Sequence, residues 1–390
     1  MATSNIDVWN GLREKYPNFA SITSQGTNDT FTSKGFSEAT STGALNEFFN
    51  LSIRTALNKI DVAKIKTRLQ ECGLVESFTG QLGGYLQRLS IEIIKPISPA
   101  YNNLQDGQSV DPFIVRKPES NERFYECGNF NYQSFITISE FQAKTIFLEE
   151  YGIANFISGI MQGLENGYKL QKEVNIYEAL NKCINDVALQ STQTVNVTIA
   201  DVNNITNDEL LSFIDIVKQT ATKMNTAIST KAFNALQFDT YRSPDDHILL
   251  LRAGIKDTIQ THLMVGAYNK EDLTLPFEIV EVADFGGLKA TSDGTTELYP
   301  KYSKIGELMG WSSTDGGEAV AENTIQWVDP NANVLGVIIQ RGTIFEEIKE
   351  PYSVRPIHNP RGLYDNYWAS APNNMIRYDK CYNVIKICKA

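Results

Sequence analysis

The sequence predicts an α+β protein, because helical and strand-like patterns occupy different parts of the chain. Between Ile153 and Tyr168 the apolar residues fall at offsets 0, 3, 4, 7, 8, 11 and 15, which is the period of an amphipathic helix. From residue 246 onward, short runs of β-branched and other apolar residues replace that pattern. Residues 90–138, which precede the helical part, predict a third element that resembles a long hairpin.

The N-terminal segment, residues 1–44, is rich in Thr, Ser, Asn and Gly and shows little apolar periodicity. Such a composition is typical of a flexible arm. Its aromatic residues, Trp9 and Phe31 among them, are nevertheless too many for a simple linker. We therefore expect an arm that becomes ordered when it docks on a partner. From Leu45 to Ile60 apolar residues recur every three or four positions, which predicts an amphipathic helix.

The segment 90–138 predicts an extended loop with little core of its own. Prolines near its start prevent a continuous helix, and Asp106-Gly107 is a turn signal at its polar centre. We take Gln105, Asp106 and Gly107 as the tip, from which the chain returns to Ile138 through aromatic and β-branched residues. A lone two-stranded ribbon is marginal in water, so we expect a neighbouring subunit to cover it.

The longest helix is expected from residue 140 to about 187, with its cap at Ser139. Gly159, Gly163 and Gly167 repeat every four residues and leave one stripe of this helix without side chains. Because each glycine costs about 0.8–1 kcal/mol relative to alanine in a helix, we expect another backbone to pack closely there.

A second helix is expected after Thr206, where Asp208-Glu209 would suit the positive end of the helix dipole. Its predicted apolar line is Leu210, Phe213, Ile214, Val217, Ala221, Met224 and Ile228. The strands that follow are predicted at 248–251, 262–267, 277–283, 324–328 and 334–340, with a last pair starting at Tyr352 and running from Ile376 to Ile387. Residues 286–323, rich in Gly, Thr, Ser and Asp, predict a long surface loop.

Composition excludes several classes of protein. The net charge of −11 argues against tight sequence-independent binding of nucleic acid, which requires the neutralisation of many phosphates. The chain lacks an 18-residue apolar run and a secretory signal pattern, so neither a membrane-spanning nor a secreted protein is expected. Five scattered cysteines without a Cys-x-x-Cys pair indicate a reduced, intracellular protein.

No catalytic, cofactor-binding or metal-binding pattern emerges from the motifs. His247 follows Asp245-Asp246, but the other two histidines complete no ligand spacing, and a turn before a strand is the simpler interpretation. The Asp315–Glu318 stretch lacks the alternating oxygen ligands of a calcium loop. Neither a phosphate-binding loop nor a nucleophile elbow is present.

The most distinctive string is Asn359-Pro360-Arg361-Gly362-Leu363-Tyr364, which is followed by further aromatic residues. Pro-Arg-Gly predicts a defined turn, and the aromatic side chains would bury a large area on packing. One interpretation is a well-anchored turn between two core strands. The other is an intersubunit ion pair made by Arg361, because arginine suits bidentate interface contacts.

This string and the strand that follows it resemble the C-terminal segment of the major capsid proteins of small phi-29-like podophages that infect Gram-positive bacteria. The order of elements agrees as well, because Asn131–Ile138 precedes a long helix and the second helix and the strands follow. The resemblance covers about residues 65–390. It implies the Hong Kong 97-type capsid fold, with an N-terminal arm, an extended loop, a peripheral domain with a long spine helix, and an axial domain.

The resemblance implies the following division of the chain: an N-terminal arm and helix over 1–75, a connection over 76–87, and the extended loop over 88–138. The spine helix of the peripheral domain would occupy 139–190, the axial domain 191–335, and strands returning to the peripheral domain 336–390.

The implied function is that of a structural, non-enzymatic subunit that assembles into the icosahedral head shell of a tailed bacteriophage. Its expected partners are copies of itself in pentamers and hexamers, together with scaffolding and portal proteins. The shell would enclose double-stranded DNA without binding it specifically and without a membrane, after assembly in the bacterial cytoplasm. Two alternatives stay open: an encapsulin-like compartment that encloses a cargo enzyme, and another virion protein such as a tail component.

Overall fold

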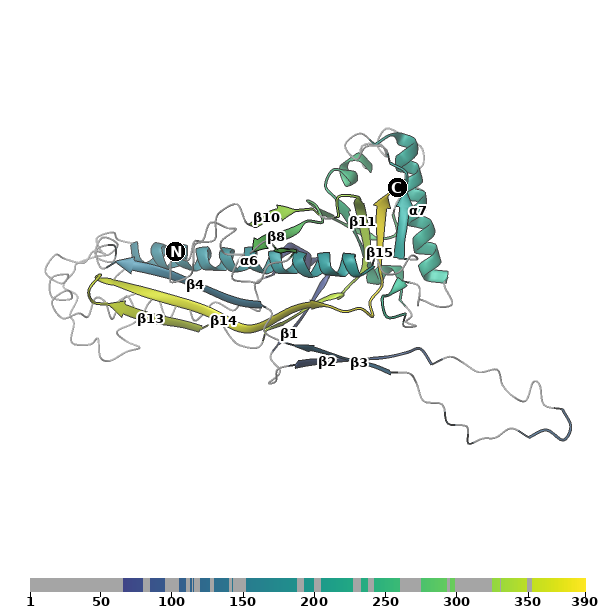
Figure 1. Ribbon diagram of the computed structural model, residues 1–390, viewed down its shortest axis with the longest axis horizontal. Helices are drawn as coiled ribbons and strands as arrows, with labels where there is room; N and C mark the ends of the chain where they lie inside the picture. The colour runs from purple at the N-terminus through teal and green to yellow at the C-terminus, as the bar shows by residue number, and fades with distance from the viewer. Residues whose placement is uncertain are drawn as a thin grey trace. The chain divides into compact units, whose positions relative to one another are not determined.

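The structure is a computed structural model (Figure 1). It describes residues 66–79, 85–94, 105–109, 113, 115, 120–126, 130–139, 142, 152–187, 193–199, 205–226, 233–237, 242–259, 275–292, 295–298, 325–329, 331–348 and 353–390. Residues 1–65 of the expected N-terminal arm and helix, the strand at 262–267 and the Asp315–Glu318 stretch lie outside these residues.

The chain divides into two compact units. The first comprises residues 1–67, 128–173 and 347–374, and the second comprises residues 68–127, 174–346 and 375–390. Three elements contribute residues to both units: α6 (Gly152–Val187), β12 (Ile344–Ile348) and β14 (Tyr364–Tyr378).

The second unit contains a five-stranded sheet in the order β5 (Thr194–Val197), β15 (Val384–Lys389), β11 (Val334–Gln340), β6 (His247–Arg252) and β7 (Glu278–Val282). The central strand β11 is antiparallel to both β15 and β6 and is buried along its whole length. Strands buried on both faces are continuous apolar runs, which is why β6 and β11 were predictable.

The sheet joins strands from two parts of the chain that we expected to belong to different domains. β15 and most of β11 come from residues 336–390, whereas β5, β6 and β7 come from residues 191–335. We also expected one strand from Ile376 to Ile387, but a turn at 379–383 separates β14 from β15. The nearly continuous apolar run of β15 (Val384–Lys389) is suited to the centre of a buried sheet, which accounts for its placement.

Helix α7 (Asn207–Thr226) packs on this sheet and confirms the predicted second helix. Thr206 and Glu209 form a capping box, in which the Thr206 amide donates to the Glu209 carboxylate at 2.8 Å and the Glu209 amide faces the Thr206 hydroxyl. The predicted apolar residues from Leu210 to Met224 are buried in one core cluster with strand residues such as Leu249 and Ile338.

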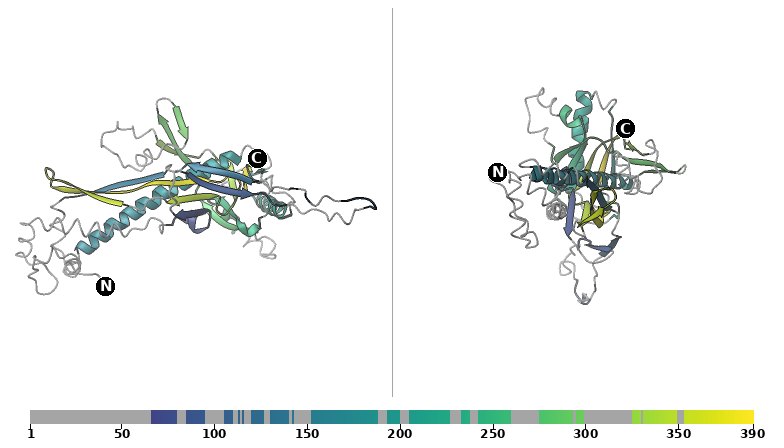
Figure 2. Two further views of the ribbon diagram at one scale, coloured as in Figure 1. Left: turned by 90° about the horizontal axis from the view of Figure 1, so that it is seen from below. Right: turned by 90° about the vertical axis from the view of Figure 1, so that its left-hand side faces the viewer.

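Two short strands, β8 (Gly287–Ser292) and β9 (Thr295–Leu298), lie within the surface loop that we expected over 286–323, and β10 (Ile325–Val328) corresponds to the strand predicted at 324–328. β8 lies between β9 and β10 in a separate sheet, drawn in green in Figure 2. Threonine is β-branched and favours strands even in a polar segment. The Asp293-Gly294 pair between Ser292 and Thr295 is the hairpin signal that the composition obscured.

In the first unit, β14 lies between β13 (Ser353–Asn359) and β4 (Phe130–Ser139), antiparallel to both. Alternate residues of β14 from Asp365 to Ala371 are buried, as expected for a strand with one covered face. On β4, Phe135 stacks on Trp368 with ring centroids 4.8 Å apart. The expected hairpin over 88–138 is therefore wrong at its C-terminal end, because 130–138 pairs with β14.

Helix α6 has 36 described residues and confirms the long helix. Ser139 and Gln142 form the reciprocal hydrogen bonds of a capping box, since the Gln142 amide donates to the Ser139 hydroxyl and the Ser139 amide donates to the Gln142 side chain, both at 3.2 Å. The expected start of the helix between them and Gly152 lies largely outside the described residues. At the two glycines of the stripe for which the surroundings are described, Gly159 and Gly163, the expected close packing is not found among the described residues. A Cβ atom added at Gly159 or Gly163 would meet no atom within 4 Å.

The first described residues form α4 (Arg68–Glu71), which was expected in the N-terminal arm, and β1 (Val75–Thr79), most of which was expected in the connection over 76–87. In the second unit β1 neighbours β12, and β12 neighbours β14. Leu69 and Leu74 are fully buried, which explains why this stretch joins the folded unit.

Candidate functional site

The second unit carries a two-stranded ribbon that pairs with no other strand among the described residues. β2 (Tyr85–Ile91) and β3 (Ser120–Glu126) run antiparallel, with Tyr85 opposite Glu126 and Ile91 opposite Ser120. We call the side that bears Leu86, Arg88 and Tyr125 the inner face, because its side chains are buried or half-buried. The opposite side is the outer face.

The outer face exposes large apolar side chains. The exposed fractions are 64% for Tyr85, 55% for Leu89, 55% for Ile91 and 62% for Phe124. A sheet face of this kind is ordinarily buried against another layer, and contiguous exposed apolar surface marks an interaction site. The ribbon therefore has a covered side within its own unit and an uncovered apolar side.

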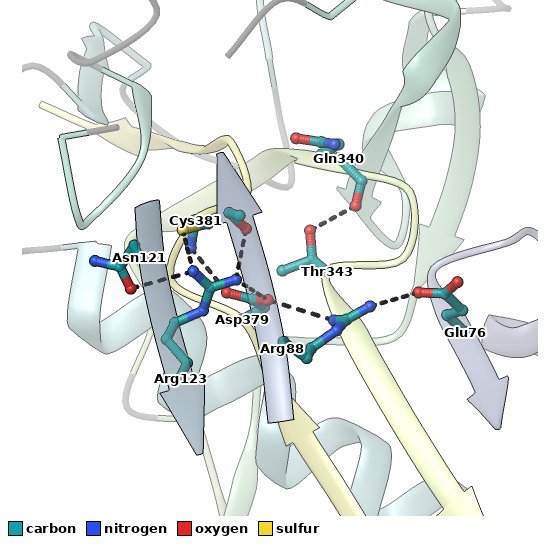
Figure 3. Close-up of polar contacts among 9 residues, drawn as sticks. Glu76, Arg88, Asn121, Arg123, Gln340, Thr343, Asp379 and Cys381 are labelled. Carbon is teal, nitrogen blue, oxygen red and sulfur yellow. Dashed lines mark hydrogen bonds and ion pairs between the residues drawn. The ribbon is translucent and has the colours of Figure 1, made fainter. Parts of the chain in front are cut away.

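A cluster of charged side chains, shown in Figure 3, holds the inner face of the ribbon against the turn that carries Asp379. Arg88 on β2 and Arg123 on β3 stand directly opposite each other in the strand register. Both donate to one oxygen of Asp379, Arg123 at 2.9 Å and Arg88 at 3.4 Å. Asp379 is buried, with a side chain only 1% exposed. A carboxylate buried to this degree needs charged or hydrogen-bonding partners, and the two guanidinium groups supply them.

Each arginine has further partners beside Asp379. Arg123 donates to the Ser90 hydroxyl at 2.8 Å and to the Asn121 side chain at 3.3 Å, and it also contacts the Cys381 sulfur. Arg88 pairs with the half-exposed Glu76 at 2.7 Å.

Aromatic rings surround Arg88 in addition to these polar partners. Its guanidinium carbon lies 4.6 Å from the Phe345 ring centroid and 5.3 Å from that of Phe78. Phe345 in turn packs edge-on against Tyr125, with centroids 4.8 Å apart, and forms a small core with Leu86 and Met375. Cation–π contacts and apolar packing therefore hold the ribbon in addition to the ion pairs.

The electrostatics of the cluster favour a charged Arg123 beside a neutral Tyr125 and a neutral Cys381. Burial alone would lower the pKa of Arg123, but the Asp379 carboxylate outweighs this and the net pKa is raised. Burial raises the pKa of Tyr125 to about 12. Burial also raises the pKa of the Cys381 thiol, although Arg123 opposes it. Cys381 is therefore a thiol here and not a nucleophilic thiolate.

The turn that carries Asp379 is itself fixed on both sides. The Asp379 amide donates to the Thr343 carbonyl at 2.9 Å, and its second carboxylate oxygen accepts from the Cys381 amide at 3.0 Å. The neighbouring residues Tyr378 and Lys380 both contact Asp186 near the end of α6, Lys380 at 2.8 Å. Residue 379 therefore faces the ribbon while the residues on either side of it contact the helix.

The predicted loop tip forms a turn. The Gln108 amide donates to the Gln105 carbonyl at 3.0 Å, and Gly107 has a φ of +88°, which only glycine adopts readily. Gln105, Asp106 and Gly107 are all exposed. Their role in contacts between subunits stays a prediction.

The Asn359–Tyr364 string forms the turn between β13 and β14. The Asn359 side-chain oxygen accepts from the amides of Arg361 and Gly362, both at 3.1 Å, and its nitrogen donates to the Tyr364 hydroxyl at 2.8 Å. A Cβ atom at Gly362 would lie 2.2 Å from the Tyr364 ring, so glycine is required. Leu363 has a φ of +51°, which is uncommon for a residue with a side chain.

The described contacts within the subunit assign no role to the exposed residues of this turn. Pro360, Arg361 and Leu363 are exposed, Leu363 at 56%. Within the described ranges, the Arg361 guanidinium makes no hydrogen bond or ion pair. The anchored-turn interpretation thus accounts for Asn359, Gly362 and Tyr364, whereas the role of Arg361 stays a prediction.

The motifs that suggested chemistry have structural explanations where they are described. His247 is buried, with its Nδ1 2.9 Å from the Ser243 carbonyl oxygen and its ring edge-on to Phe277. It follows the short 3₁₀ helix η6 (Pro244–Asp246) at the start of β6, as the simpler interpretation predicts. No group of three metal-ligating side chains is found among the described residues. In the same ranges no helix has the length and apolar character needed to cross a bilayer.

Sequence reasoning missed the Arg88–Arg123–Asp379 cluster. One signal was available in the sequence. Arg88 and Arg123 stand at the alternate positions that also hold Leu86, Ser90 and Tyr125, and such a mixture is unusual for a strand face that points to solvent. Nothing in the sequence links these arginines to Asp379, which follows Arg123 by more than 250 residues.

Comparison with solved structures defines the class of fold. The chain is similar to one in the capsid structure of Staphylococcus phage Andhra, with 15% identity, a TM-score of 0.59, and coverage of 85% of this chain and 87% of that chain. It is also similar to a chain from the structure of the head fibre and inner core protein gp22 of native bacteriophage P68, with 13% identity, a TM-score of 0.58, and coverage of 85% and 86%. The fold is thus a mixed helix-and-strand fold of the phage-capsid class.

Residues 20–388 match the family described as Phi29-like phage major capsid protein, and the chain belongs to that family. No curated protein matches the chain. The predicted function is confirmed: this is the major capsid protein of a tailed phage, a structural protein of the shell, and its location is the virion capsid. The encapsulin-like and tail-protein alternatives are not favoured.

Proposed function

We propose that this subunit builds the shell in the Hong Kong 97 manner, by laying its β2–β3 ribbon on a neighbouring copy of itself. The ribbon would be the extended loop, α6 the spine helix of the peripheral domain, and the sheet around β11 the core of the axial domain. The subunits would form pentamers and hexamers without catalytic activity, assisted by scaffolding and portal proteins, and would enclose double-stranded DNA without binding it specifically.

The distribution of exposed apolar side chains carries this proposal. In the described part of the chain, eight of the fourteen large apolar residues that are exposed lie between residues 85 and 124. A single subunit gains nothing from exposing them, since burial of an apolar side chain is worth about 1.5–3 kcal/mol. A second copy that covers the outer face would recover that free energy, and the closed symmetry of a shell provides one such copy for every ribbon.

Removal of the loop tip tests the proposal. A variant lacking residues 100–110 should give a folded, unassembled subunit with an unchanged unfolding midpoint, because the described contacts of the ribbon's inner face lie at its base. Sedimentation and negative-stain electron microscopy, with and without coexpressed scaffolding protein, should show no closed shells. Shells of normal size from this variant would refute the role of the ribbon.

We also propose that Arg361 makes an ion pair with a second copy. The observation that supports it is an exposed Arg361 on a turn that the Asn359 side chain fixes through hydrogen bonds to the Arg361 and Gly362 amides and the Tyr364 hydroxyl. Arg361→Ala should impair assembly while the unfolding free energy of the subunit changes by less than about 0.5 kcal/mol, as is usual for an exposed side chain. Arg355→Ala, an exposed arginine on the adjacent strand, is the matched control and should assemble normally. Unfolding of the Arg361→Ala subunit would favour the anchored-turn interpretation.

A further inference from the structure

The two arginines of the ribbon oppose its formation unless a third residue is present. Arg88 and Arg123 are directly opposite in the antiparallel register. Like charges at such a position destabilise a strand pair, and an isolated two-stranded ribbon is already marginal in water. The base of this ribbon therefore contains a repulsion that its own pairing does not remove.

Asp379 removes the repulsion. Its carboxylate is the group, among the described residues, that accepts hydrogen bonds from both guanidinium groups. Glu76 contacts Arg88 only, and its side chain is 46% exposed, so water screens that pair more strongly. The buried carboxylate of Asp379 thus turns two repelling charges into a three-membered network that holds both strands.

Asp379 reaches this position only when the segment that carries it is folded. It lies between β14 (Tyr364–Tyr378) and β15 (Val384–Lys389). Its backbone is held by Thr343 next to β12, and its neighbours Tyr378 and Lys380 are held by Asp186 of α6. The strand β15, which follows directly, lies between β5 and β11 in the main sheet of the second unit. A chain whose last strand is not yet in place lacks the carboxylate that the ribbon needs.

We propose that Asp379 makes the order of the β2–β3 ribbon conditional on the folding of the C-terminal segment, so that a subunit presents its assembly surface only when its own fold is complete. Incomplete chains would keep the ribbon disordered and would not join a growing shell. The part of this proposal that concerns assembly rests on the proposed function of the ribbon. The part that concerns order does not.

Hydrogen exchange on the unassembled full-length chain tests the order of the ribbon. In Asp379→Asn, amide exchange in β2 and β3 should rise at least tenfold, while exchange in β6 and β11 stays within threefold of the parent. Asp379→Asn/Arg123→Gln should bring ribbon exchange back toward the parent value, because one of the two repelling charges is gone. Glu76→Gln is the matched control and should change ribbon exchange by less than threefold.

The double variant separates repulsion from simple loss of contacts. If Asp379 acted only as one more contact, removal of Arg123 as well would raise exchange further, and that result would overturn the proposal. Unchanged ribbon exchange in Asp379→Asn would overturn it too. If Asp379→Asn fails to fold, the single variant Arg123→Gln is compared with the double variant Asp379→Asn/Arg123→Gln. The proposal requires that ribbon exchange in these two variants agrees within threefold.

Shell formation by the same variants distinguishes this inference from the proposed function. We expect Asp379→Asn to form at least tenfold fewer shells than the parent and the double variant to recover most of them. If the ribbon is disordered in Asp379→Asn but shells form normally, the ribbon's conditional order stands and its role in assembly is refuted. If ribbon exchange is unchanged, the inference fails whatever the shells do.

Discussion

Replacement of Leu89 by glutamine probes the outer face of the ribbon without disturbing its base. Leu89 is 55% exposed and lies opposite Glu122, away from the Asp379 network. Substitution at an exposed position usually changes the unfolding free energy by less than about 0.5 kcal/mol. The unassembled subunit should therefore keep its urea unfolding midpoint.

The effect on assembly can be worked out from the exposed fraction. Full burial of a leucine side chain is worth about 1.5–3 kcal/mol, so covering the 55% that is exposed would contribute roughly 1 kcal/mol per contact. Glutamine forfeits that contribution and brings a polar group that costs about 1 kcal/mol more to bury. A total of about 2 kcal/mol corresponds to an association constant lower by roughly 30-fold. The concentration at which shells first form should rise by a similar factor.

Light scattering over a concentration series measures that threshold. Leu211→Gln is the matched control, because Leu211 is 51% exposed and belongs to the same unit but lies on α7. It should leave the threshold within about threefold of the parent value. An unchanged threshold for Leu89→Gln would refute the reasoning, and so would an equal rise for both variants, since the loss would then follow from apolar surface in general.

Two further predictions concern the fold that presents the ribbon. Gly336→Ala in β11 should lower the unfolding free energy by about 1–2 kcal/mol, because the new Cβ would lie 3.0 Å from the Leu250 carbonyl oxygen of the paired strand. Urea unfolding measures the change. A midpoint equal to the parent's would show that β11 and β6 can move apart at no cost in stability. Stability should also fall as the pH rises from about 10 to about 12, because burial raises the pKa of Tyr125 to about 12 and the unfolded chain therefore loses this proton first. Urea unfolding at pH 8 and pH 11 measures the loss, and Tyr125→Phe should reduce it; an equal loss in that variant would assign the pH dependence to other groups.

Local patterns were sufficient to predict some elements. The period and cap of α7 identify it, since helices with one apolar face and a capping box specify both their start and their buried side. The buried strands β6 and β11 are visible for a similar reason, as uninterrupted runs of Ile, Leu and Val. The long helix α6 was also predicted, although Gly159 and Gly163 of its glycine stripe meet no other backbone among the described residues.

Long-range pairing set the limit of the prediction. The alternating pattern of β4 predicts a strand but does not say which strand it joins, so β4 was assigned to the ribbon although it pairs with β14. In the same way β15 was expected apart from residues 191–335, although it pairs with β5 (Thr194–Val197). The tip and the Asn359–Tyr364 turn were found because turn chemistry is local. The Asp379 network was not, because it depends on which segments meet in space.

The two faces of the ribbon divide the requirements of a shell subunit between them. The inner face provides strong, specific fastening through a buried carboxylate and an aromatic-lined arginine, and these contacts exist before any partner arrives. On the proposed function, the outer face would provide apolar area that is worth little per contact, so that a misplaced subunit could still leave. Closure would then come from the number of identical contacts and not from the strength of each one. Weak contacts can close a shell only if every ribbon leaves its subunit in the same orientation. We infer that the Asp379 network holds the ribbon in that orientation.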